Sequence, residues 1–223
     1  MASLTIENYV KTIYQICARQ EDQPAATGQL AGALEVSPGT VTSMLKTLSD
    51  TGLAEYTPYE GVRLTESGSK LALRVLRRHR LIELFLVETL KLSWDEVHEE
   101  AENMEHAVSD LLVDRIDEYL GFPASDPHGD PIPKADGTIS TPPGRSLGDW
   151  PHRQRFRLVR VLDQSPQFLR YLSEAGLPLG AEGSVRENNP DAGTVTIDVD
   201  GRRVTLSHEV AARLRVASPI EVA

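Results

Sequence analysis

Six side chains between residues 79 and 106 have the types and the spacing of metal ligands. They are His79, Glu83, His98, Glu102, Glu105 and His106. The last four stand at positions i, i+4, i+7 and i+8, so on one helix they would lie within an arc of roughly 100°. The first two form an i, i+4 pair, a spacing at which two side chains can bind one ion. A solvated acidic face with scattered histidines would also produce this pattern, but six donors in one short stretch favour a site for a divalent cation.

The acidic charge of the chain is concentrated around these residues. The 223 residues carry 23 Lys+Arg and 33 Asp+Glu, a formal net charge of −10. Residues 81–121 alone hold 12 acidic residues against 2 basic ones. So many neighbouring carboxylates repel one another unless water or cations neutralise them. The single cysteine, Cys17, excludes an intramolecular disulfide and an all-cysteine zinc site, so a metal would use histidine, carboxylate or amide ligands.

The residues before this stretch predict a winged helix-turn-helix. Apolar residues recur at helical spacing over 6–17, Thr27 is expected to cap a short second helix, and Ser37 is expected to cap a third. Two short extended runs, 53–57 and 62–65, then predict a β-hairpin. Elements in this order can place the third helix in the major groove of DNA, although a helix-turn-helix also serves as a plain packing motif.

Small hydroxyl side chains on the predicted third helix, together with residues near the hairpin tip, are the candidate DNA contacts. Small side chains allow a close approach to phosphates and base edges, and the N-terminus of a helix favours a phosphate. The candidates are Ser37, Gly39, Thr40, Thr42, Ser43 and Lys46 on the helix, and Tyr59 and Arg63 on the hairpin. Because the region has few basic residues, binding would depend on dimerisation and on metal that offsets the acidic charge.

Two long helices, over 66–89 and over 93–121, are expected next. The second begins at a capping box formed by Ser93 and Glu96, and such a helix pair after a winged helix usually supplies a dimer interface. Alternating apolar residues and an Asp200-Gly201 turn then predict a small SH3-like β-barrel near the C-terminus. The predicted fold is mainly α with a small β domain. Its parts are a winged-helix DNA-binding domain over 1–65, a helical metal-binding and dimerisation domain over 66–122, a Pro/Gly-rich linker over 123–151 and an SH3-like domain over 152–223.

Membrane and export signals are absent from the sequence. No run approaches the roughly 18 apolar residues of a membrane span, and the first residues lack the pattern of a signal peptide. We therefore expect a cytoplasmic protein with no membrane partner.

With these residues in hand, the chain resembles the diphtheria toxin repressor and manganese transport regulator family of metal-dependent transcriptional repressors. The resemblance covers nearly the whole chain. The matching segments are T-I-E-N-Y-V-K-T-I-Y at 5–14, S-P-G-T-V-T at 37–42, L-T-E-S-G at 64–68, R-H-R-L-I-E at 78–83, V-H-E-E-A-E-N-M-E-H at 97–106 and P-H-G-D-P-I-P at 127–133.

The resemblance implies two metal sites and a set of ligands for each. One site would use Asn8, Glu102, Glu105 and His106. The other would use His79, Glu83 and His98, with Gln164 and Gln167 aligned to ligands that the C-terminal domain lends. Iron-responsive members place sulfur ligands where this chain has Asn8 and Glu102, and manganese-responsive members place carboxylates at both. Oxygen donors suit the hard Mn²⁺ ion, so manganese is the expected co-repressor, two ions per subunit are expected, and iron is the alternative.

The function implied by the resemblance is repression of metal homeostasis genes. A homodimer would bind a double-stranded operator of two-fold symmetry, with no small-molecule substrate and no catalysis. Two other interpretations stay open at this point. A dimetal carboxylate enzyme would need a nucleophile, a zincin motif or a glycine-rich loop, none of which the sequence supplies. A winged-helix regulator could instead sense an organic ligand or a partner protein.

Overall fold

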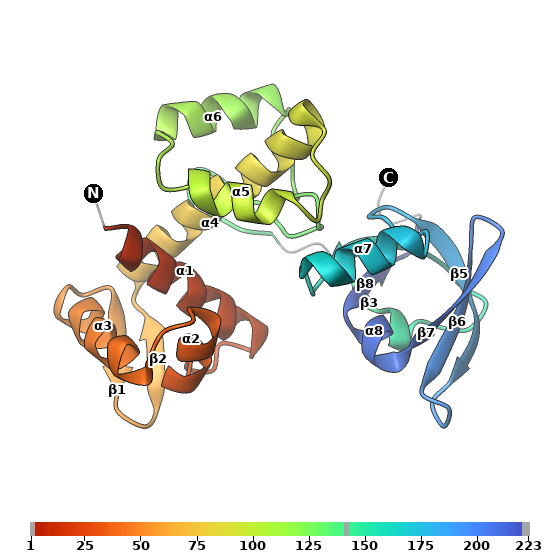
Figure 1. Ribbon diagram of the computed structural model, residues 1–223, viewed down its shortest axis with the longest axis horizontal. Coiled ribbons are helices and arrows are strands. Elements are labelled where there is room, and N and C mark those ends of the chain that lie inside the picture. Colours follow the sequence, from red (N-terminus) through yellow and green to blue (C-terminus); the bar gives the residue numbers. More distant parts are fainter. Residues whose placement is uncertain (1–2, 141–142, 220–223) are drawn as a thin grey trace. The chain divides into compact units, whose positions relative to one another are not determined.

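The structure, a computed structural model, describes residues 3–140 and 143–219 and divides into two compact units (Figure 1). The first unit comprises the described part of Met1–His79 together with Glu105–Val108 and Pro133–Thr138. The second comprises Arg80–Met104, Ser109–Ile132 and the described part of Ile139–Ala223. The boundary falls inside one continuous helix, α4 (Glu66–Leu90).

The first unit contains three helices followed by a hairpin, which confirms the predicted winged-helix order. The elements are α1 (Leu4–Arg19), α2 (Thr27–Ala33), α3 (Pro38–Asp50), β1 (Ala54–Thr57) and β2 (Gly61–Leu64). Ser37 caps α3 as predicted, since its Oγ accepts a hydrogen bond of 3.1 Å from the backbone N–H of Thr40. The prediction for α2 is wrong by one residue. Ala26 is the N-cap, and the Gln29 side chain accepts from its backbone N–H at 2.8 Å.

The core of the first unit joins the three helices to the hairpin. Its fully buried apolar side chains include Val10, Ile13, Leu30, Val41, Leu45, Leu48 and Val62. Burial of each such side chain contributes roughly 1.5–3 kcal/mol to folding. The hairpin is held further by paired backbone bonds between Ala25 and Val62, at 2.9 and 3.0 Å. Gly61 is required beside them, because its φ is +107° and a Cβ there would lie 2.8 Å from the Ala25 carbonyl oxygen.

The expected single helix over 93–121 is wrong, because the chain forms two helices with a break between them. These are α5 (Val97–Met104) and α6 (Asp110–Tyr119). Ser109 begins the second helix, since its Oγ accepts from the backbone N–H of Leu112 at 3.3 Å. Glu105 and His106 therefore lie in the turn between the helices. They do not share a helical face with His98 and Glu102 as predicted.

The C-terminal part of the second unit is a six-stranded antiparallel sheet with the strand order β3-β8-β4-β5-β6-β7. Its elements are β3 (Arg145–Ser146), the 3-10 helix η1 (Leu147–Asp149), β4 (Arg155–Val161), α7 (Pro166–Glu174), β5 (Glu182–Asn189), β6 (Thr194–Val199), β7 (Arg202–Ser207), α8 (His208–Ala212) and β8 (Leu214–Ala217). Asp200 and Gly201 join β6 to β7 with φ of 49° and 76°, as the predicted turn type requires. This small sheet domain is the predicted β domain.

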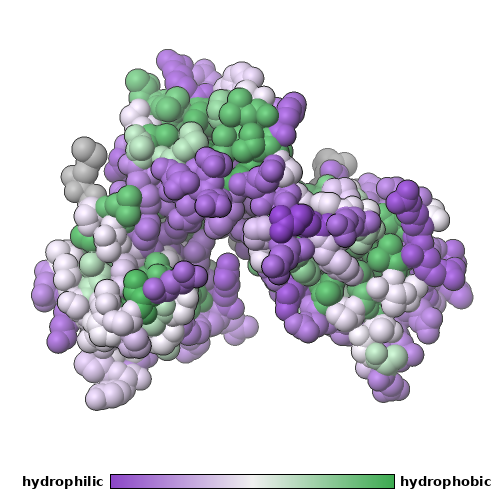
Figure 2. Space-filling model, viewed as in Figure 1, coloured by the Kyte–Doolittle hydropathy of each residue, from purple (hydrophilic) through white to green (hydrophobic). Residues whose placement is uncertain are grey.

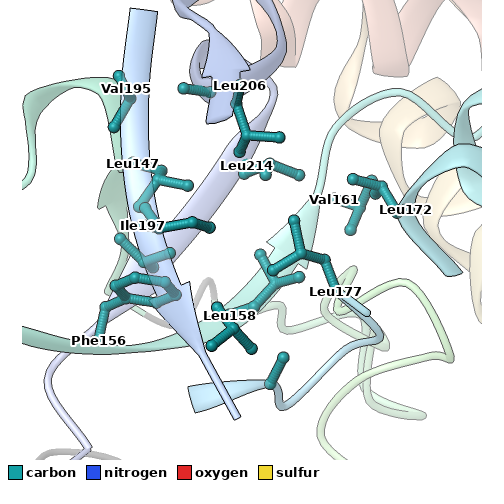
Figure 3. Packing of buried hydrophobic residues seen from close by; sticks show 14 of the residues in the cluster. Leu147, Phe156, Leu158, Val161, Leu172, Leu177, Val195, Ile197, Leu206 and Leu214 are labelled. Carbon is teal, nitrogen blue, oxygen red and sulfur yellow. The ribbon is translucent and has the colours of Figure 1, made fainter. Parts of the chain in front are cut away.

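A separate hydrophobic core fills the sheet domain (Figure 3). Phe156, Leu158 and Val161 of β4 are buried in one cluster with Ile197 of β6 and Leu172 of α7. The cluster also includes Leu147 and Trp150, which lie in the segment predicted as a linker over 123–151. The end of that segment is therefore part of the sheet domain, since β3 pairs with β8. The sequence did not predict β3, because the prolines and glycines of this segment leave too little apolar alternation to indicate a strand.

None of the helices within residues 3–140 and 143–219 combines the length and the apolar character that a membrane-crossing segment needs.

Candidate metal centre

Glu105 is the centre of a cluster of ionisable side chains in the first unit. Its carboxylate is fully buried. One oxygen, Oε2, lies 2.5 Å from Nδ1 of His79, and the other, Oε1, lies 2.6 Å from Nζ of Lys11. Nε2 of His106 is 3.2 Å from the same Oε1 atom. The structure thus brings together Glu105, His106 and His79.

Glu105 remains an anion inside this cluster. Burial by itself would raise the pKa of its carboxyl group, but the hydrogen bond from His79 and the positive charge of Lys11 outweigh burial and hold the pKa below its ordinary value. A buried carboxylate of this kind attracts cations, and the Lys11 ammonium is one cation beside it.

His106 is oriented by a carboxylate that the sequence analysis missed. Nδ1 of His106 lies 2.7 Å from Oε2 of Glu7. Nε2 of His106 is buried and makes no hydrogen bond. Histidines that bind metals usually hold their second ring nitrogen against a carboxylate or a carbonyl in this way. Glu7 escaped notice because an acidic residue in the first turn of a helix is common without any ligand role.

Asn8 contributes an unsatisfied acceptor to the first unit. Its side-chain Oδ1 atom is buried and has no hydrogen-bond partner. A buried polar atom without a partner is costly, and a cation is one way to satisfy an oxygen acceptor. The amide oxygen therefore has the properties expected of the metal ligand that the sequence predicted.

A second cluster lies in the second unit around Glu83. Glu83 is buried, and its Oε1 atom lies 3.1 Å from Nδ1 of His98. Its Oε2 atom is 3.8 Å from Nδ1 of His128. Nε2 of His98 lies 3.8 Å from Oε1 of Glu102, one turn further along α5. Glu83, Asp126 and His128 are all buried, and one donor atom of each lies within 4.8 Å of the others, so these three could hold a metal ion.

His128 and Asp126 are site candidates that the sequence analysis did not select. Nε2 of His128 lies 2.7 Å from the Trp94 carbonyl oxygen, and its buried Nδ1 has no hydrogen-bond partner. Burial raises the pKa of Asp126 well above its ordinary value, and the neighbouring carboxylates of Glu83 and Asp130 add to the effect. Both residues lie in or beside P-H-G-D-P-I-P, a motif used for the resemblance but placed in the predicted linker. A histidine between two acidic residues was the available signal.

The two glutamines predicted as ligands have different surroundings. The Gln164 side chain donates to Oδ2 of Asp130 at 3.2 Å. Asp130 also pairs with Arg80, at 3.3 Å, and with Arg160, at 2.5 Å. Gln167 is exposed in the first turn of α7. Among the contacts described, Gln164 is linked to the second cluster by its hydrogen bond to Asp130 alone.

The candidate DNA contacts lie on the surface of the first unit. Ser37, Gly39, Thr40, Ser43, Lys46, Tyr59 and Arg63 are exposed, and Thr42 is half-buried. Tyr59 stands at the hairpin tip with its side chain fully exposed. The hydroxyl of Thr42 donates to the Pro38 carbonyl oxygen at 2.9 Å, so it is satisfied within the helix in the absence of DNA.

The donor sets of both clusters are oxygen and nitrogen atoms. Carboxylate, amide and imidazole donors suit divalent ions such as Mn²⁺, Fe²⁺ and Zn²⁺, whereas soft ions prefer sulfur. Three buried atoms make no hydrogen bond and are acceptors that such an ion would satisfy: Asn8 Oδ1, His106 Nε2 and His128 Nδ1. The residues present therefore fit a divalent metal.

Comparison with known proteins agrees with this chemistry. Residues 1–62 match the iron dependent repressor N-terminal DNA binding domain, residues 65–134 match the iron dependent repressor metal binding and dimerisation domain, and residues 145–218 match the FeoA domain. The iron-dependent repressor IdeR of Mycobacterium bovis is 32% identical over 225 residues, covering 95% of this chain and 96% of that protein. The diphtheria toxin repressor of Corynebacterium efficiens is 31% identical, covering 95% and 94%. A solved manganese-dependent transcriptional repressor in complex with manganese is 40% identical with a TM-score of 0.86, covering 96% of this chain and 99% of that one.

The winged helix, the histidine and carboxylate clusters and these matches define a class of protein, the metal-dependent transcriptional repressors that bind DNA. The chain belongs to the iron-dependent repressor family, as the resemblance in its sequence predicted. Members of this family are repressors rather than enzymes, which sets aside the dimetal carboxylate enzyme.

Proposed function

We propose that this protein is a manganese-dependent repressor that acts in the cytoplasm as a homodimer and binds two ions per subunit. The observation that carries the proposal is the buried cluster of the first unit, in which Asn8 Oδ1 and His106 Nε2 are acceptors without hydrogen-bond partners and Glu105 is an anion. A buried anion beside two acceptors without hydrogen bonds is the arrangement expected of a cation site.

The first ion would bind Asn8, Glu105 and His106, with Glu102 at the end of α5 as the further predicted ligand. A bound divalent cation would supply positive charge between α1 of the winged helix and the turn that follows α5. Asn8 would then restrain the position of the winged helix, and Glu7 would keep the His106 ring in place. Three oxygen donors and one imidazole favour Mn²⁺ over a softer ion, and iron remains the alternative that the curated relatives' names suggest.

The second ion would bind in the cluster around Glu83. His98 and His128 approach opposite oxygens of this carboxylate, at 3.1 and 3.8 Å, and Asp126 completes a buried set. His79 stands one turn before Glu83 in α4, as the sequence prediction noted, although its hydrogen bond goes to Glu105. Gln164 would act on this site through Asp130. Gln167, which is exposed, would need to approach the ion from α7.

DNA binding would use the exposed surface of α3 and the hairpin. Ser37, Gly39, Thr40, Thr42, Ser43 and Lys46 would face the major groove, with Tyr59 and Arg63 on the adjacent backbone or minor groove. In a homodimer the two α3 helices would match operator half-sites about 34 Å apart or a multiple of that spacing. If metal restrains each winged helix at one position, that position would determine whether the two α3 helices can contact both half-sites at once.

Exposed apolar residues of α6 support the homodimer. Leu111, Leu112 and Tyr119 are exposed by 70%, 48% and 69%, and Phe122, just after the helix, by 72%. Figure 2 shows hydrophobic residues gathered on the surface of the part that carries α6. An apolar patch of this kind usually marks an interface with another chain.

The test is a fluorescence-anisotropy titration of the protein against a palindromic operator of a metal-uptake gene at fixed salt. Mn²⁺, reduced Fe²⁺, Zn²⁺ and a chelator are compared. We expect the affinity for DNA to rise at least about tenfold with Mn²⁺, and less with Fe²⁺, because coupling of 1–3 kcal/mol is typical between two linked sites. A larger response to Fe²⁺ would overturn manganese, and no response to any metal would overturn the proposal as a whole.

A further inference from the structure

Lys11 is a buried lysine of α1, one turn after Glu7 on the same face of the helix. The buried residues of α1 are Tyr9, Val10, Lys11 and Ile13. The Lys11 residue is 5% exposed. An ammonium group loses its hydration when it is buried, so it is retained only where a partner compensates its charge. The burial of Lys11 in the first unit therefore depends on the group that compensates its charge.

One oxygen of Glu105 is a close partner of this ammonium group. Nζ of Lys11 lies 2.6 Å from Oε1, and the two side chains are 6% and 0% exposed. The other oxygen, Oε2, is taken by His79 at 2.5 Å. Lys11 thus brings a positive charge to the carboxylate at the centre of the candidate metal site, and Nε2 of His106 lies 3.2 Å from the same Oε1 atom.

An ammonium group at Glu105 Oε1 limits how many metal ions the Glu105 carboxylate can bind. A carboxylate with two oxygens can bridge two metal ions, as in dinuclear sites. At Glu105, one of the positions from which an ion could approach Oε1 is already occupied by an ammonium group. Like charges at such separations repel strongly in a buried site where water screens them little.

We propose that Lys11 is the resident second cation of the Glu105 centre and that it restricts this centre to a single metal ion. The inference rests on the proposed function, because it concerns the metal centre of the repressor. In the metal-free protein the Lys11 ammonium compensates the buried carboxylate. When the centre is loaded, the same ammonium fills the space of a second ion and weakens the attraction for the first. Lys11 thereby determines both the number of ions and their affinity.

The experiment counts ions by isothermal titration calorimetry with Mn²⁺ in the absence of DNA, and records the electron paramagnetic resonance spectrum of bound Mn²⁺. An Asp126→Asn background weakens the cluster around Glu83, so that the Glu105 centre dominates the titration. In this background we expect one Mn²⁺ per subunit at the Glu105 centre, with the spectrum of an isolated ion. Lys11→Glu, which replaces the ammonium by another carboxylate, is expected to bind a second Mn²⁺ there, with the broadened spectrum of a coupled pair.

Lys11→Met keeps a long unbranched side chain, one atom shorter than lysine, and removes the ammonium group with its charge, so it tests the proposal even if Lys11→Glu does not fold without metal. We expect Lys11→Met to bind its single Mn²⁺ at least about tenfold more tightly, since a repelling charge is gone. Lys70→Met is the matched control, because Lys70 is an exposed lysine paired with Glu66 on the surface of α4. The control should leave affinity and ion number unchanged.

Two results would overturn the role of Lys11. One is a Lys11→Met protein whose Mn²⁺ affinity equals that of its parent or is weaker, which would make Lys11 a purely structural counter-ion. The other is a folded Lys11→Glu protein that still binds one isolated ion. Failure of the proposed function is recognised separately, because the parent protein would then bind no Mn²⁺ at the Glu105 centre and its affinity for DNA would not respond to metal.

Discussion

Glu7 and His106 are separated by 99 positions in the chain, and Oε2 of Glu7 lies 2.7 Å from Nδ1 of His106. In a neutral imidazole, a proton on Nδ1 that is donated to Glu7 leaves Nε2 as the lone-pair nitrogen. That nitrogen is buried, makes no hydrogen bond and lies on the side of Glu105. Glu7 therefore selects the ring form of His106 that can bind a metal, and it does so from the residue next to the candidate ligand Asn8.

The first prediction concerns Glu7 as a positioning residue. Glu7→Gln keeps the size of the side chain but removes its negative charge, so the His106 ring is held less firmly and its Nε2 atom is a weaker donor. We expect Mn²⁺ affinity to fall about 10–100-fold, the usual effect of losing an outer partner of a metal-binding histidine. Calorimetry without DNA measures this. Glu55→Gln, at an exposed residue of β1, is the control, and equal affinity in the two variants would contradict the role of Glu7.

The second prediction separates metal binding from stability at the same centre. Glu105→Ala removes the carboxylate that pairs with the buried Lys11 ammonium at 2.6 Å, and breaking a buried ion pair by removing one partner costs about 3–5 kcal/mol. We expect this variant to lose both metal binding and thermal stability. His106→Ala removes a candidate ligand without leaving a buried charge, so it should lose metal-dependent DNA binding while its melting temperature changes little. Thermal unfolding of the metal-free proteins distinguishes them, and equal melting temperatures would show that the Lys11 contact contributes little.

The sequence predicted those parts of the molecule that depend on local patterns. Helical spacing of apolar residues located α1, α3 and α4, and Ser37 with Pro38 marked the start of the third helix. The Asp200-Gly201 pair located the β6–β7 hairpin. The family resemblance pointed to Asn8, a residue that no local pattern selects.

The features that the sequence did not predict depend on contacts between residues far apart in the chain. A continuous helical pattern over 93–121 concealed the break after Met104, where Glu105 contacts Lys11 and His79 instead of continuing the helix. His128 and Asp126 lie in a segment without periodicity, so only the three-dimensional structure places them beside Glu83. The burial of Lys11 has no sequence signal, because a lysine within an amphipathic helix is usually exposed.

The third prediction follows from the raised pKa of Asp126. Burial and the neighbouring carboxylates keep this group protonated in the folded, metal-free protein at pH values where the unfolded chain has released the proton. The free energy of unfolding should therefore fall as pH rises from the ordinary aspartate pKa toward the raised one. Asp126→Asn removes this dependence, so we expect the metal-free variant to be more stable than the parent at neutral pH while its second cluster binds Mn²⁺ more weakly.

Thermal unfolding in chelator between about pH 5 and pH 8 measures this contribution. Asp191→Asn is the matched control, since Asp191 is exposed in the turn between β5 and β6. If Asp126→Asn lowers the melting temperature at neutral pH as well as weakening the second cluster, the carboxyl group serves the fold and not a metal site.

The fourth prediction concerns the exposed start of α3. Thr40→Ala removes a hydroxyl that is hydrogen-bonded to Ser37 Oγ at 2.9 Å and is placed at the end of the helix that would face DNA. Loss of one hydrogen bond to DNA should weaken operator affinity about tenfold, while Mn²⁺ affinity without DNA stays the same. Thr47→Ala on the same helix is the control. A Thr40→Ala protein that binds the operator normally would place the DNA contacts elsewhere.

The fifth prediction concerns Asn8 and the choice of metal. An amide oxygen is a hard donor, whereas the thioether of methionine is soft, so Asn8→Met should move the preference from Mn²⁺ toward Fe²⁺. Asn8→Asp should move it in the opposite direction and tighten Mn²⁺ binding, because a carboxylate adds negative charge where the buried amide oxygen has no partner. Calorimetry with each ion under reducing conditions gives the ratio of the two affinities. Opposite shifts in the two variants would identify Asn8 Oδ1 as a ligand, whereas an unchanged ratio in both would show that the metal is chosen by Glu105 and its histidines alone.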